Sequence, residues 1–114
     1  MSFEQLHVYQ RALSFVDDIY ALTLVWPKEE IYGLTDQLKR ASVSIVLNIA
    51  EGSSRTKKDF RHFLDISRGS CYECIAILSI ANKRHFIIES QYTKMYDECV
   101  VVVKMINALR SSLK

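Results

Sequence analysis

The stretch SIVLNIAEGSS, residues 44–54, decides the fold, because it is a helical pattern that is apolar on two sides. With 3.6 residues per turn, Ile45 and Ile49 share one face, whereas Val46 and Leu47 fall on the opposite side. Asn48 lies in the polar line between the two faces. A helix of a small bundle needs one apolar stripe to face the core, so the second apolar side predicts a partner.

The composition outside this stretch favours a helical protein of ordinary globular type. Of the 114 residues, 49% are hydrophobic and 25% are charged, and only three glycines and one proline interrupt the chain. The length predicts one domain over residues 1–114. No run of about 18 apolar residues is present, so we predict no membrane span.

Four helical patterns follow one another along the chain. Trp26 precedes Pro27 and should end the first, because the residue before proline leaves the helical region. We expect Gly52 to close the second in the left-handed conformation and Ser90 to cap the fourth. Short connections make neighbouring helices antiparallel, so the predicted fold is all-α, an antiparallel up-and-down four-helix bundle. The predicted helices span about 4–24, 34–51, 56–85 and 91–113.

The third predicted helix repeats the two-sided pattern of the second. Ile66 and Ile77 lie away from its main apolar seam, beside the small residues Gly69 and Ser70. Apolar residues outside the core-facing side of two adjacent helices favour an interface between copies of the chain. A bundle that buries more than one face of a helix would also explain them. In the same way, Asn48 and Glu51 either fix the register between packed helices or point to water.

Catalytic and metal-binding patterns are weak. Glu4 and His7 form a single Glu-x-x-His spacing, whereas a di-metal bundle site needs two such pairs and two further glutamates. Cys71 and Cys74 fall on the core seam of the third helix, where we expect reduced thiols that act as small apolar residues, as in a cytoplasmic protein. We therefore expect no enzyme activity, no cofactor and no metal.

Basic residues concentrate in the middle of the chain, although the net charge is only +2. Lys57, Arg61 and Arg68 fall within about 40° of one another on the helical wheel, and Asp65 dilutes them. Such a stripe can contact a nucleic-acid backbone by charge, and a solvated helical face is the alternative. The candidate nucleic-acid-binding residues are Lys39, Arg40, Arg55, Lys57, Lys58, Arg61 and Arg68.

Two segments, YGLTDQLKRASVSIVLNIAEGSSR (32–55) and KDFRHFLDISRGSCYE (58–73), carry a family resemblance. They resemble the four-helix-bundle proteins encoded in intervening sequences of bacterial 23S rRNA genes, and are similar to the accessory variability protein of diversity-generating retroelements. FEQLHVYQRAL (3–13) and WPKEEIYGL (26–34) match the opening of the same family.

The resemblance implies a homopentamer without catalytic activity that associates with RNA or with a reverse transcriptase–RNA complex. It marks Arg55 as the signature residue best suited to touch a phosphate. Val46 and Leu47 depart from the family pattern, in which a proline or smaller residues are frequent. A protein-interaction scaffold, for example for a reverse transcriptase, is the alternative function. The predicted assembly and signature residues are Val43, Leu47, Asn48, Glu51, Gly52, Ile66, Gly69, Ser70, Glu73 and Ile77.

Overall fold

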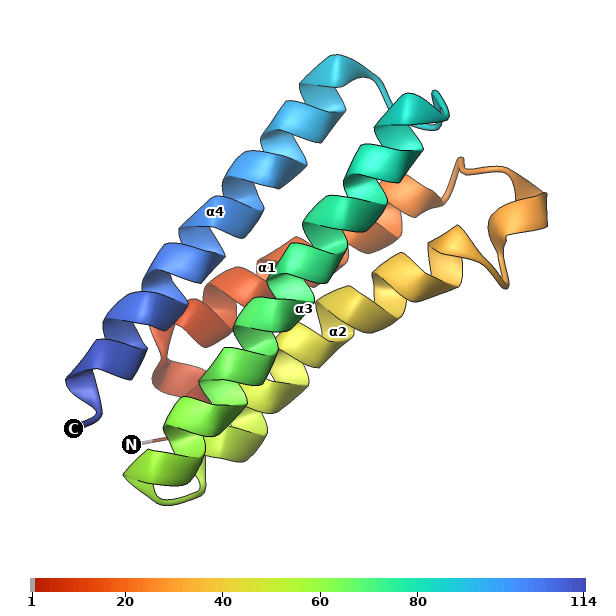
Figure 1. The fold of residues 1–114 in the computed structure, drawn as a ribbon. Coiled ribbons are helices and arrows are strands. Elements are labelled where there is room, and N and C mark those ends of the chain that lie inside the picture. The colour runs from red at the N-terminus through yellow and green to blue at the C-terminus, as the bar shows by residue number, and fades with distance from the viewer. Residues whose placement is uncertain (1) are drawn as a thin grey trace.

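The computed structural model describes residues 2–114, which contain four α-helices and two short 3₁₀-helices joined by short connections (Figure 1). No strand occurs in this part of the chain, so the predicted all-α class and the four helices are confirmed. The elements are η1 (Phe3–Gln5), α1 (His7–Thr23), η2 (Lys28–Glu30), α2 (Leu34–Ser53), α3 (Lys57–Lys83) and α4 (Glu89–Ser112).

The helices pack as a closed ring, in which each helix contacts the next and α1 also contacts α4. η1, the α2–α3 connection and the end of α4 lie at one end of the bundle, and the α1–α2 and α3–α4 connections lie at the other (Figure 1). The molecule measures 43 × 24 × 20 Å, with its long axis along the helices. No helix in the described chain is both long enough and apolar enough to span a bilayer.

The core contains mainly branched aliphatic side chains and one fully buried phenylalanine. Cys71, Cys74 and Cys99 lie within it as free thiols with no exposed surface, which confirms the predicted place of Cys71 and Cys74 in the core. Burial raises the pKa of Cys71 to about 12 and raises that of the other two thiols still further. The largest fully buried side chains are Phe15, Ile19, Leu38, Ile45, Ile49, Leu64, Leu78, Val102, Ile106 and the three cysteines.

Two predicted helix ends are wrong. α4 begins at Glu89 rather than after Ser90, with Ile88 at the N-cap position, and the Gln91 side chain accepts a hydrogen bond from the Ile88 N–H at 3.0 Å. The left-handed residue between α3 and α4 is His85, with φ 64°, and none of the glycines has a positive φ.

Gly52 therefore does not close α2 in the way that the sequence suggested, because α2 continues to Ser53. Its role is close packing. A Cβ atom at this position would lie 2.7 Å from Phe63 Cβ and 2.8 Å from Phe60 Cδ1, well inside contact distance. Glycine thus lets the end of α2 approach the beginning of α3.

Candidate nucleic-acid interface

The corner between α2 and α3 presents three of the predicted basic residues, Arg55, Lys57 and Lys58, all of them exposed. α3 begins after Thr56, whose Oγ1 accepts a hydrogen bond from the Asp59 N–H at 3.2 Å. This cap places Lys57 and Lys58 in the first turn, where both side chains are exposed and, within residues 2–114, neither makes an ion pair. Both ammonium groups are therefore accessible to an anion.

Arg55, in the connection itself, is already engaged. Its guanidinium pairs with the Glu51 carboxylate one turn earlier and lies over the Phe63 ring, 5.5 Å from the centroid. The hydrogen bond and the charge of Glu51 raise the pKa of Arg55. Any phosphate at Arg55 must share it with Glu51.

A second group of cations lies where α3 contacts the end of α4, and we call it the arginine cluster: Arg61, Arg68 and Arg110 with Asp65. Arg110 donates to both carboxylate oxygens of Asp65, at 2.6 Å and 3.2 Å, and Arg68 donates to one of them at 3.1 Å. The hydrogen bond from Arg110, aided by the charges of both arginines, holds the pKa of Asp65 below its usual range.

The side chains of the cluster also tie α3 to the last turn of α4. Arg61 donates to the Leu113 carbonyl, and Arg68 donates to Asn107 Oδ1 at 2.6 Å. Arg110 was not among the predicted site residues. Arg110 follows Asn107 by three residues, which places both on one side of α4, a sequence signal that could have marked it.

Lys39 and Arg40 lie apart from the other five predicted basic residues. Both are in the first third of α2, about 20 Å from the corner at 1.5 Å per residue. Lys39 Nζ lies over the Tyr20 ring, 4.7 Å from its centroid, and Arg40 pairs with Asp36 at 2.9 Å. The structure therefore divides the seven predicted residues among the corner, the arginine cluster and the first part of α2.

The predicted assembly residues also divide, into buried and exposed sets. Gly52, Ser70 and Ile77 are buried within the chain itself, and Val46, which the helical wheel placed on the outer side, is buried too. The more exposed set lies on the outer surface of α2 and α3, with Leu47 60% and Ile66 40% exposed. It consists of Leu47, Glu51, Ile66, Gly69 and Glu73, with Val43 and Asn48 half-buried beside it.

The polar line of α2 is satisfied inside the chain. Asn48 Nδ2 donates to the Ser44 carbonyl at 2.8 Å and to Ser44 Oγ at 3.0 Å. Ser70 Oγ of α3 donates to the same Ser44 hydroxyl at 2.9 Å. Asn48 thus belongs to a small network between α2 and α3, whereas the Glu51 carboxylate pairs with Arg55 on the surface.

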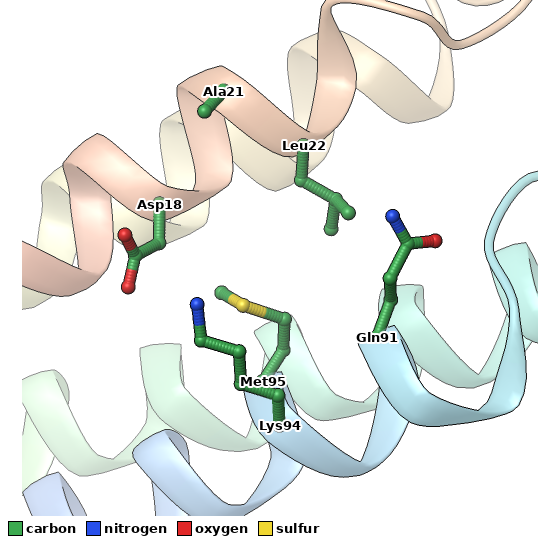
Figure 2. A pocket seen from close by; sticks show the side chains of 6 residues that line it. All are labelled: Asp18, Ala21, Leu22, Gln91, Lys94 and Met95. Atoms are coloured by element: carbon green, nitrogen blue, oxygen red, sulfur yellow. The ribbon is translucent and has the colours of Figure 1, made fainter.

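A pocket of about 270 Å³ lies between α1 and α4 (Figure 2). The Asp18 carboxylate approaches it from α1, while the Lys94 ammonium and the Gln91 amide approach it from α4. Leu22, Ala21 and Met95 supply its apolar surface. No three His, Cys, Asp or Glu side chains are placed to hold a metal ion anywhere in residues 2–114.

Comparisons with known proteins agree with the family resemblance. The sequence profile of the 23S rRNA-intervening sequence protein family matches residues 4–108, and the chain belongs to this family. The fold is similar to the crystal structure of a protein of unknown function from the S23 ribosomal protein family of Bacteroides thetaiotaomicron, with a TM-score of 0.81. That protein is 20% identical, and the match covers 90% of this chain and 97% of that one, so it shows the fold alone. No curated protein matches the sequence.

Proposed function

We propose that this chain is a non-enzymatic, self-associating protein of the cytoplasm that binds the backbone of structured RNA. The observation that carries the proposal is the pair of exposed lysines, Lys57 and Lys58, which make no ion pair in the described chain and lie at the corner beside Arg55 and Arg61. Membership of a family named for rRNA intervening sequences supports RNA as the partner. Phosphate contacts of this kind position a protein on RNA without reading its sequence.

Self-association is the second part of the proposal. The chain is an antiparallel up-and-down bundle, and copies of it associate as a homopentamer through the outer surface of α2 and α3. Support comes from Leu47 and Ile66, two large aliphatic side chains that remain exposed on adjacent helices. A ring of five copies repeats a weak basic surface five times, so that separate phosphate contacts act together on one RNA.

The test is a fluorescence-anisotropy titration of a structured RNA hairpin at about 50 and 200 mM salt. We expect binding that weakens steeply with salt and that is lost in the double variant Lys57→Glu/Lys58→Glu. The matched control is Lys83→Glu/Arg84→Glu, which reverses two adjacent exposed charges at the opposite end of α3. Equal loss in both variants would mean that net charge, and not the corner, determines binding.

The alternative function is a protein-interaction scaffold, for example an accessory subunit of a reverse transcriptase, that contacts RNA only indirectly. The observation that favours it is the exposed apolar connection between α1 and α2, where Leu24 is 82% and Tyr32 is 96% exposed. Failure of the wild-type protein to bind RNA at low salt, together with capture of a reverse transcriptase that resists nuclease, would replace the first function by this one.

A further inference from the structure

The arginine cluster holds more positive charge than its single carboxylate neutralises. Arg68 and Arg110 both pair with Asp65. Arg61 donates to the Leu113 carbonyl and makes no ion pair in the described chain, so three guanidinium groups accompany one carboxylate. These side chains come from two helices, and Arg110 is 45 residues from Asp65 in the sequence. The charge is therefore assembled by folding and is not a feature of one basic segment.

An open depression of about 400 Å³ adjoins the cluster. Arg61, Arg110 and Lys114 line it together with Ser111 and Leu113, and none of these residues is acidic. The charged side chains of the lining are all cationic, and guanidinium, ammonium and hydroxyl groups can donate to the acceptors of a ligand. An oxyanion has this chemistry.

We infer that the arginine cluster and its depression form a phosphate-binding site of the RNA surface, and that Asp65 occupies the place that a phosphate takes. This inference rests on the proposed function and names the residues that contact the RNA backbone. The phosphate is that of a phosphodiester chain, because the depression is open and Lys57 lies on the same side of α3, about 16 Å along the helix from Arg68. Phosphates that are separated by more than one nucleotide along a strand can reach both.

The geometry of the Asp65 pair supports this exchange. Arginine binds carboxylate and phosphate through the same two parallel N–H···O bonds, and Arg110 already makes this bidentate contact with Asp65. The Asp65 side chain is 36% exposed and that of Arg110 is 40% exposed. Solvent screens an ion pair at such exposure, so a ligand with more charge can displace it.

Asp65 has two opposing effects in this arrangement. It holds Arg68 and Arg110 at a fixed separation, which lowers the ordering cost when a phosphate arrives. It also competes with that phosphate for the same donors. Isolated phosphates should bind poorly, whereas an RNA strand that also contacts the corner should bind well.

The experiment compares the wild-type protein with Asp65→Asn, Arg110→Gln and the control Lys104→Gln, an exposed lysine on α4 that does not line the depression. Affinity for an RNA hairpin is measured by anisotropy from about 50 to about 200 mM salt, and circular dichroism checks that each variant is helical. The Asp65→Asn change keeps the size of the side chain and removes its charge, so we expect binding about two- to fivefold tighter, with a steeper salt dependence. Arg110→Gln should weaken binding and reduce the slope of log K against log salt by about 1.

Unchanged or weaker binding by Asp65→Asn would overturn the inference, as would equal salt slopes for Arg110→Gln and Lys104→Gln. In either case the wild-type protein still binds, so the proposed function stands. Absence of RNA binding by the wild-type protein and by Asp65→Asn alike would instead remove the proposed function, and the inference with it. Binding by Asp65→Asn alone would support the inference and show the competition at its strongest.

Discussion

Gly52 brings two helices together because only a hydrogen atom fits between the backbone of α2 and the phenylalanines at the start of α3. The atom nearest to a methyl group placed on Gly52 would be Phe63 Cβ, at 2.7 Å, which is fixed to the backbone of α3. Gly69, on the exposed side of α3, has no atom within 4 Å of the corresponding position. Two helical glycines of one protein thus have opposite tolerance for a side chain.

We predict that Gly52→Ala destabilises the protein by about 1–3 kcal/mol, because the methyl group overpacks the contact between α2 and α3. Gly69→Ala should instead stabilise the folded chain by about 0.5–1 kcal/mol, since alanine loses less backbone entropy in a helix. Urea unfolding of both variants measures the difference. A Gly52→Ala protein as stable as wild type would mean that the helices can separate at no cost.

At the same scale, the sequence predicts the exposed cations better than their partners. Lys57 and Lys58 follow a helix start that is readable from Thr56 and Asp59, and both are exposed as a charged first turn should be. Asp65 was visible only as a charge that dilutes the stripe. Its contact with Arg110 depends on how α3 and α4 align, which no local pattern of residues specifies.

Among the elements, the contact between α1 and α4 has the most unusual electrostatics. Burial, reinforced by the neighbouring carboxyl group of Asp18, raises the pKa of Glu98 from 4.5 to about 7. Asp18 belongs to α1, and Glu98 belongs to α4, one turn after Lys94. Asp18 and Lys94 both line the pocket between α1 and α4 (Figure 2). Lys94 and Arg11 oppose the shift without cancelling it.

We predict that Glu98→Gln stabilises the protein at pH 8 by about 0.5 kcal/mol, after allowance for solvent screening of a partly exposed carboxyl. The folded chain holds its proton more tightly than the unfolded chain, so wild-type stability falls as pH rises from about 4.5 to about 7 and then stays level. The Glu98→Gln variant lacks this pH dependence. The difference in unfolding free energy between the variant and the wild type should therefore vanish below pH 4.5. Urea unfolding at about pH 4, 6 and 8 tests this, with Asp97→Asn as the control on the exposed side of α4. A difference in unfolding free energy that is the same at all three pH values would contradict the raised pKa of Glu98.

The existence of all four helices could be predicted from apolar spacing, and their ends only in part. The start of α3 is readable from Thr56 and Asp59. The predicted stop of α2 at Gly52 is wrong, and the cap of α4 uses a backbone donor of Ile88 and the side chain of Gln91. The turn before it relies on His85 in a left-handed conformation, which glycine or asparagine would have signalled. The Phe86 N–H donates to the Ala81 carbonyl at 2.9 Å, so backbone hydrogen bonds close α3 here without a glycine.

For the whole molecule, the proposed self-association rests on the exposed aliphatic side chains of α2 and α3, Leu47 and Ile66. We predict that Leu47→Lys/Ile66→Lys converts the assembly into monomers, because two charges would be buried without partners at the interface. Sedimentation velocity measures the mass, and helicity should be unchanged, since neither side chain is in the core. Ile88→Lys is the control, as Ile88 is 65% exposed at the far end of the bundle. A wild-type protein that sediments as a monomer would contradict the proposed assembly.

Chemical labelling of the three thiols in the core can measure how the folded chain opens. Only a thiolate reacts with an alkylating reagent, and in the folded state the sulfurs of Cys71, Cys74 and Cys99 are fully buried, with pKa values raised by burial. Because they lie on α3 and α4, both helices must part before reagent arrives. Mass spectrometry of the alkylated chain therefore distinguishes opening of the whole core, which adds three labels at once, from fraying, which adds none.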